Sequence, residues 1–165
     1  SATRINLKIM NKYLISACLV GENVRYDAKN CLQDKLKQLL DTQQAVVICP
    51  EVSGGLSTPR QPAEIVGGDG YQVLKGQAKV KDANGDNVSA EFILGAEKTL
   101  KLAQYHQVTH IILKANSPSC GSQMIYDGSF SGHKISGKGV TAARLEQYGF
   151  SVLAEDEFLK QLAHE

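Results

Sequence analysis

The sequence contains no apolar run that approaches the roughly 20 residues a helix needs to cross a bilayer, so we expect no transmembrane segment. Residues 1–9, SATRINLKI, also lack the long apolar segment and the small-residue cleavage site of a secretory signal. We therefore expect a cytoplasmic protein with one folded domain at residues 10–165. Residues 1–9 are expected to be a leader or appended residues, with Met10 as the native start.

Charge of one sign is not in excess either. The formal net charge is +1, and the lysines are scattered along the chain rather than clustered. Nucleic-acid backbones and anionic membranes are bound by clustered basic residues, so the composition predicts neither as a partner. A small or neutral molecule fits better, and we expect a monomer or a weak homodimer.

Closely spaced cysteine pairs are missing as well. The four cysteines are widely separated, at Cys18, Cys31, Cys49 and Cys120. A secreted disulfide scaffold is denser in cysteine, and structural zinc sites usually contain CxxC pairs. The spacing therefore predicts reduced thiols in a cytoplasmic setting.

What the chain does contain is an alternation of strand and helix patterns. Strands that alternate with helices indicate a mostly parallel sheet with helices on both faces. The predicted fold is α/β: a single-domain, Rossmann-like, three-layer arrangement. Short apolar runs predict strands at 13–18, 45–49, 110–114 and 150–154, and apolar stripes at helical spacing predict helices at 28–42, 89–106, 140–148 and 155–164.

The remaining segments carry weaker signals. Residues 50–70 and 116–139 are rich in Gly, Pro and Ser and are predicted to be loops, and residues 71–88 to be a hairpin or an irregular excursion. The run AVVIC at 45–49 has no polar alternation, which is typical of a strand buried on both faces.

Three cysteines stand at or just after the carboxyl ends of predicted strands, namely Cys18, Cys49 and Cys120. The carboxyl ends of parallel strands share one edge of a sheet, and ligands bind outside that edge. We therefore predict that these three thiols meet at one site, although any one of them alone could simply pack in the core. Cys31 falls within the predicted helix 28–42, where packing is the favoured interpretation.

The residues leave open what such a site holds. Zinc is one option, with His133 completing a set of three cysteines and one histidine in a binding module. An iron–sulfur cluster is another, since three thiolates on four irons leave one iron open to a soft sulfur ligand. The third is an enzyme without a metal, in which surrounding amides lower the pKa of Cys120 and make it a nucleophile or persulfide carrier.

Polar residues beside the cysteines are candidates for substrate chemistry. Glu51 follows Cys49 by two positions and is a candidate general acid or base, with a solvated loop carboxylate as the alternative. Ser117 and Ser119 are candidates for hydrogen bonds to substrate or to a cluster sulfide, with a role in the turn as the alternative. Arg60 could orient a carbonyl group or pair with the nearby Glu64.

Four blocks of sequence together resemble a bacterial family, the thiouracil desulfidases, long known only as a domain of unknown function. The resemblance extends over essentially the whole chain from Met10 on. The second and third blocks are the most specific. The blocks are SACLVG (16–21), CPEVSGGLSTPRQPAEI (49–65), LKANSPSCGS (113–122) and GKGVTAARLEQYGF (137–150).

The resemblance implies a non-redox cleavage of a carbon–sulfur bond, in which 2-thiouracil and water give uracil and sulfide. It also implies a [4Fe–4S] cluster held by three cysteines, which by motif are Cys18, Cys49 and Cys120. Glu51 is implied as the acid or base that activates water or protonates the ring. Ser117 is implied to help place the substrate or the transferred sulfur. The physiological thiolated base or nucleoside stays open.

Overall fold

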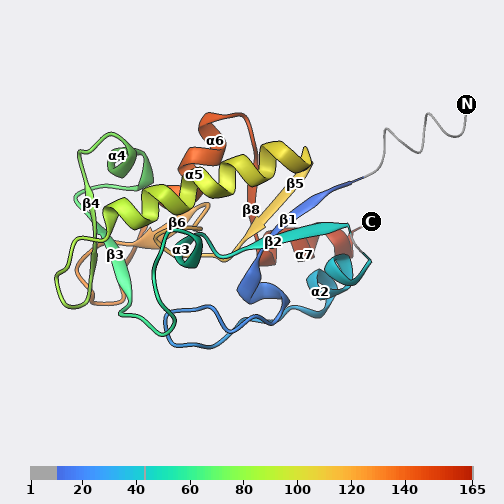
Figure 1. Ribbon diagram of the computed structural model, residues 1–165, viewed down its shortest axis with the longest axis horizontal. Coiled ribbons are helices and arrows are strands. Elements are labelled where there is room, and N and C mark those ends of the chain that lie inside the picture. The colour runs from blue at the N-terminus through green and yellow to red at the C-terminus, as the bar shows by residue number, and fades with distance from the viewer. Residues whose placement is uncertain (1–10, 43, 165) are drawn as a thin grey trace, which may run out of the picture.

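The computed structural model describes residues 11–42 and 44–164 (Figure 1). The predicted leader at 1–9 and the predicted start at Met10 lie outside these residues.

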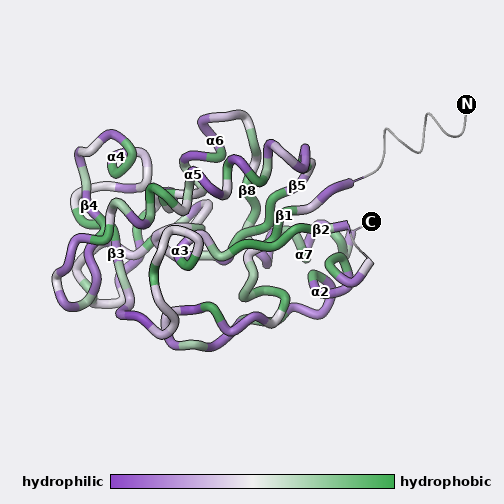
Figure 2. The backbone as a smooth tube through the Cα atoms, viewed as in Figure 1, coloured by the Kyte–Doolittle hydropathy of each residue, from purple (hydrophilic) through white to green (hydrophobic). Residues whose placement is uncertain are grey.

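A four-stranded parallel sheet forms the centre of the molecule, with strand order β2-β1-β5-β8. Figure 2 shows hydrophobic residues along β1, β2 and β5, as expected for strands rich in β-branched residues inside a layered fold. In the register, Ile15 pairs with Val47 on one side and Ile112 on the other. The strands are β1 (Tyr13–Ser16), β2 (Ala45–Ile48), β5 (His110–Leu113) and β8 (Val152–Ala154).

Helices cover both faces of this sheet. Successive side chains of a strand point to opposite faces, and β1 shows this directly: Leu14 packs with Leu145 in one apolar cluster, and Ile15 packs with Leu36 in another. The predicted three-layer α/β fold is therefore confirmed. The main helices are α2 (Asp34–Asp41), α5 (Ser89–His106), α6 (Val140–Gln147) and α7 (Glu155–Ala163).

Two predicted loops contain regular structure. Ile65 and Ile125 are buried in a third apolar cluster with Phe92 of α5, and these contacts order short strands inside segments that are rich in Gly, Pro and Ser. Two antiparallel pairs result, β3 (Ala63–Val66) with β4 (Lys79–Asp82) and β6 (Met124–Tyr126) with β7 (Lys134–Ser136). The short helices α3 (Pro50–Ser53) and α4 (Gly70–Leu74) complete this part of the chain.

The helix predicted at 28–42 begins only at Asp34. Ala28 has φ 62°, a left-handed conformation that a right-handed helix excludes. The amide of Cys31 donates instead to the carbonyl of Cys18 (2.8 Å), so Cys31 lies in a loop beside η1 (Ala17–Val20) and not in a helix.

The other predicted helices agree with the structure, and α5 has the predicted bounds. One strand differs in its environment: β2 lies at an edge of the sheet and its residues are only partly buried, so the prediction of a strand buried on both faces was wrong. None of the helices in the described part of the chain is long and apolar enough to span a membrane.

Candidate active site

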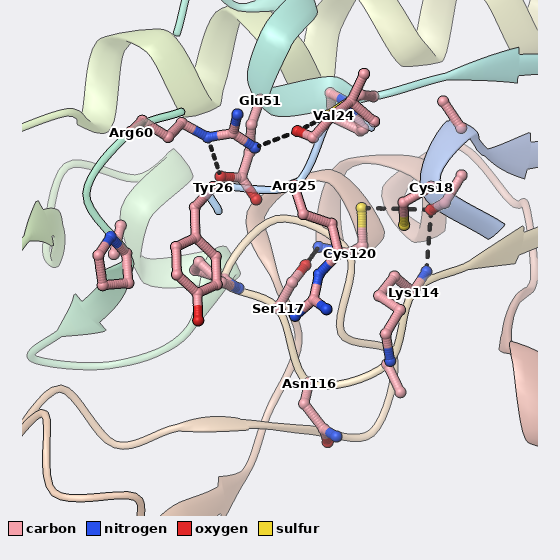
Figure 3. A pocket seen from close by; sticks show the side chains of 18 of the residues that line it. Cys18, Val24, Arg25, Tyr26, Glu51, Arg60, Lys114, Asn116, Ser117 and Cys120 are labelled. Carbon is pink, nitrogen blue, oxygen red and sulfur yellow. Dashed lines mark hydrogen bonds and ion pairs between the residues drawn. The ribbon is translucent and has the colours of Figure 1, made fainter. Parts of the chain in front are cut away.

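A cavity of about 360 Å³ lies where β1, β2 and β5 end. Cys18, Cys49 and Cys120 all line it, so the structure brings the three predicted thiols to one place. Figure 3 labels two of them, Cys18 and Cys120. Each thiol follows its strand closely, since Cys18 sits in η1, Cys49 directly precedes α3 and Cys120 lies in the loop after β5. The shared carboxyl edge of the parallel sheet is the physical reason for this convergence.

The loop that carries Cys120 is fixed at both ends. The Cys120 amide donates to Ser117 Oγ (2.7 Å), and the hydroxyl of Ser16 donates to Cys120 Sγ (3.8 Å). The first turn of α6 packs on the same loop, with the amide of Val140 donating to the carbonyl of Pro118 (2.8 Å). These contacts hold the thiol in place relative to the sheet.

Glycines set the position of Cys49 and Glu51. A Cβ on Gly95 of α5 would lie 1.9 Å from the Pro50 carbonyl oxygen, and a Cβ on Gly54 would lie 1.9 Å from the Glu91 carbonyl oxygen. Helix α3 therefore rests on α5 with backbone against backbone. Any side chain at these two glycines would push α3 and its neighbours away.

Burial disfavours the ionised form of each of the three thiols. Burial raises the pKa of Cys18 to about 12, and the nearby Cys31 and Cys49 add to that shift. Burial also raises the pKa of Cys49 and of Cys120, which corrects the expectation that amides lower the pKa of Cys120. Thiolates in this cavity need a positive charge beside them, and a bound metal centre supplies one.

The donor set fits a polynuclear iron centre better than a single ion. Within residues 11–42 and 44–164, no three His, Cys, Asp or Glu side chains are grouped to hold one metal ion. His133, which was considered as a zinc ligand, is exposed and pairs with Ser131 (2.8 Å) outside the cavity lining. In a cluster each thiolate binds a different iron, so the three sulfur atoms need not meet at one point.

Glu51 faces the cavity, paired with Arg60 (Figure 3). Arg60 Nε donates to Glu51 Oε1 (3.2 Å), and its terminal nitrogens donate to the carbonyls of Ser57 and Val24 (both 3.0 Å). Burial raises the pKa of Glu51, and the charge of Arg60 opposes that shift. The partner of Arg60 is therefore Glu51. Glu64 instead accepts hydrogen bonds from backbone amides of the β6–β7 turn.

The two candidate serines differ. Ser117 lines the cavity, whereas Ser119 is fully buried and shares a hydrogen bond with Thr141 (2.8 Å). The prediction that Ser119 contacts substrate is not supported, because its side chain points into the contact with α6.

Several cavity residues were not singled out from the sequence. Arg25 and Tyr26 come from the loop after η1, and Lys114 and Asn116 flank the end of β5. Their positions offered a signal, since Lys114 and Asn116 lie inside the LKANSPSCGS block and Arg25 follows the SACLVG block closely. Lys114 pairs with Glu155 (2.7 Å) at the start of α7.

This arrangement defines a class: α/β proteins that gather soft sulfur ligands at the carboxyl edge of a parallel sheet. Within that class, the 2-thiouracil desulfurase family matches residues 13–157, which is most of the chain. The chain belongs to the 2-thiouracil desulfurase family and is a desulfidase.

Two proteins are similar to this chain over most of its length. A Bacillus subtilis (strain 168) protein, the uncharacterised YbbK, is 50% identical over 144 residues, which are 87% of this chain and 95% of that protein. A solved structure of a [4Fe–4S]-dependent thiouracil desulfidase, TudS, is 40% identical with a TM-score of 0.80. The match covers 93% of this chain and 97% of that chain, which confirms the resemblance and the fold.

Proposed function

We propose that this protein converts 2-thiouracil and water to uracil and sulfide, and that Cys18, Cys49 and Cys120 hold a [4Fe–4S] cluster for that reaction. The observation that carries the proposal is the convergence of the three thiols on the cavity that Glu51 also lines. The family of the chain and the [4Fe–4S] dependence of its structural relative support it.

The three cysteines set the character of the site. When bound through three thiolates, such a cluster supplies an iron without a protein ligand, a Lewis acid suited to the soft sulfur of a thiocarbonyl. The strand ends and the α3–α5 contact keep the ligand positions fixed. The apolar and buried surroundings of Cys18 and Cys120 limit the access of water to them.

Glu51 is proposed as the group that handles the proton. Arg60 binds one carboxylate oxygen, and the other has no hydrogen bond within the described residues. That oxygen is available to take a proton from a water molecule as the water oxygen adds to the carbon that bears sulfur. The carbon–sulfur bond then breaks with its electron pair on sulfur, and the added hydroxyl becomes the carbonyl of uracil. The proton held by Glu51 and the hydroxyl proton both leave with the sulfide, as hydrogen sulfide. Oxygen replaces sulfur at the same oxidation level, so neither oxidant nor reductant is consumed.

Ser117 is proposed to position the substrate or the departing sulfur. Its oxygen accepts the Cys120 amide (2.7 Å), which fixes the side chain at the cavity wall. The hydroxyl proton is left to donate toward the cavity.

The first experiment is iron and acid-labile sulfide per chain, with a visible spectrum, on protein reconstituted without oxygen. We expect one four-iron cluster per chain and release of uracil from 2-thiouracil. Absence of iron after this reconstitution would rule out the cluster mechanism. Zinc in its place would favour the binding module, and absence of any metal would point to Cys120 alone.

A further inference from the structure

The cavity is lined by three cationic side chains, and two of them are neutralised. Arg60 pairs with Glu51 (3.2 Å) and Lys114 pairs with Glu155 (2.7 Å). Arg25 differs, since no carboxylate of the described residues forms an ion pair with it. A positive charge without a carboxylate partner therefore faces the cavity.

The position of Arg25 is nevertheless fixed. Its Nη1 donates to Cys31 Sγ (3.2 Å), and its Cζ lies 5.8 Å from the centroid of the Tyr26 ring. Cys31 is held in turn by its amide hydrogen bond to the Cys18 carbonyl (2.8 Å). A guanidinium has five N–H donors, and a thiol uses only one of them here. The remaining donors are available to a molecule in the cavity.

The view into the cavity shows where that charge lies. In Figure 3 the Arg25 side chain extends toward Ser117, on the same side of the cavity as Cys120. Arg25 and the three cysteines line the same cavity. A ring in this cavity whose sulfur is directed at the cysteines can therefore present another polar group to Arg25.

We propose that Arg25 is a specificity-determining residue that binds the exocyclic carbonyl oxygen of the pyrimidine, and that Cys31 positions it. This rests on the proposed function. Once the sulfur of 2-thiouracil is engaged, the 4-carbonyl oxygen is the acceptor left on the neutral ring, and a guanidinium offers only donors. A 4-amino ring such as 2-thiocytosine presents a donor there instead, so two donors face each other and one stays unpaired.

The proposal also gives Cys31 a role that requires no metal. A serine at position 31 keeps an acceptor for Arg25, whereas an alanine removes it. Cys31→Ser should therefore raise KM for 2-thiouracil less than Cys31→Ala, for which we expect a few-fold increase, with kcat nearly unchanged in both.

The test compares reconstituted wild type, Arg25→Met, Arg25→Lys and a matched control, Arg144→Met. Arg144 pairs with Glu97 and stacks on Tyr148, and it does not line the cavity. For each protein we would measure iron per chain, kcat and KM for 2-thiouracil and 2-thiocytosine, and the Kd of uracil by calorimetry.

In Arg25→Met we expect full iron and a kcat/KM for 2-thiouracil reduced about 10- to 100-fold, mainly through KM. The preference for 2-thiouracil over 2-thiocytosine should shrink by a similar factor, and uracil should bind at least about 10-fold more weakly. Arg25→Lys should recover part of the loss, and Arg144→Met should match the wild type.

Two results would overturn the proposal. One is an unchanged base preference and an unchanged uracil Kd in Arg25→Met with full iron. The other is loss of iron in Arg25→Met but not in Arg144→Met, which would assign Arg25 to the cluster. If the wild type holds iron but releases no uracil from 2-thiouracil, the proposed function fails separately, and the uracil titration still decides the role of Arg25.

Discussion

The four cysteines fall into two groups, according to the surroundings of their sulfur atoms. Those of Cys18, Cys49 and Cys120 face the cavity, whereas that of Cys31 accepts a hydrogen bond from Arg25 and lies outside the cavity lining. The distinction is not one of burial alone, because Cys49 and Cys31 are both partly exposed.

This division predicts opposite results for two serine variants. Cys49→Ser should lose most of the iron and sulfide of the reconstituted protein, because a hydroxyl is a poor ligand for iron in a cluster. Cys31→Ser should keep both, along with desulfidase activity. Metal analysis of the two variants, prepared side by side, is the measurement. Loss of the cluster in Cys31→Ser would show that the ligand set proposed here is wrong.

Two glutamates, Glu51 and Glu64, line the cavity, and their carboxylates accept hydrogen bonds from different groups. Glu51 Oε1 accepts from Arg60 (3.2 Å), whereas Glu64 Oε1 accepts the amides of Gly128 (2.9 Å) and Phe130 (3.2 Å), which tie that carboxylate to the β6–β7 turn. Glu51→Gln should lower kcat about 100-fold or more, because the amide cannot take the proton from water, while iron per chain stays constant. Glu64→Gln is the matched control, since its amide oxygen can still accept from the turn. Equal kcat in the two variants would exclude Glu51 as the base.

At the scale of elements, the contact between α3 and α5 decides whether Cys49 and Glu51 stay in place. Gly95→Ala puts a methyl group where the Pro50 carbonyl oxygen lies. Alanine favours a helix over glycine by about 1 kcal/mol, so a loss of stability can come only from overpacking, which typically costs about 1–3 kcal/mol.

We therefore expect Gly95→Ala to unfold at lower denaturant concentration and to retain less iron. Leu94→Ala on the same helix is the control, because Leu94 is 47% exposed and touches neither glycine contact. Chemical unfolding curves and iron per chain are the measurements. A Gly95→Ala protein as stable as Leu94→Ala would mean that α3 adjusts without cost.

The elements also show how far the sequence predicts this structure. Periodic apolar patterns predicted α5 and the central strands, because such patterns follow directly from the burial of one face or both. The start of α2 was missed since the left-handed Ala28 has no clear sequence signal. Strands β3 and β6 were missed because single buried residues, Ile65 and Ile125, order them through tertiary contacts.

The sequence likewise predicted only some of the residues of the candidate site. Positions after strands identify which residues reach the sheet edge, so the three thiols and Glu51 were found in the cavity. The direction of a loop side chain is not encoded in such spacing, and Ser119 accordingly points to Thr141 instead. Arg25 was overlooked because only the folded chain shows that no carboxylate of residues 11–42 and 44–164 forms an ion pair with it.

At the scale of the molecule, the proposed cluster would tie three strand ends together. A centre that binds the folded chain and not the unfolded one stabilises the fold by mass action. Reconstituted protein should therefore melt at a temperature higher than the cluster-free protein by on the order of 5–10 °C. Calorimetry without oxygen measures this, with Cys49→Ser treated identically as the control. Coincident melting of the two wild-type forms would argue against thiolate ligands from all three strands.

The dispersal of the three thiols along the chain has a consequence for biosynthesis. Cys18 and Cys49 leave the ribosome early, whereas Cys120 comes only after the long helix α5 and strand β5, and its loop is held by α6. Because a nascent chain emerges from its N-terminus, two of the three thiols exist for some time without the third. With these three thiols as the proposed ligands, the site is incomplete until Cys120 and α6 have left the ribosome, so we expect iron and sulfide to be inserted late in synthesis or after it.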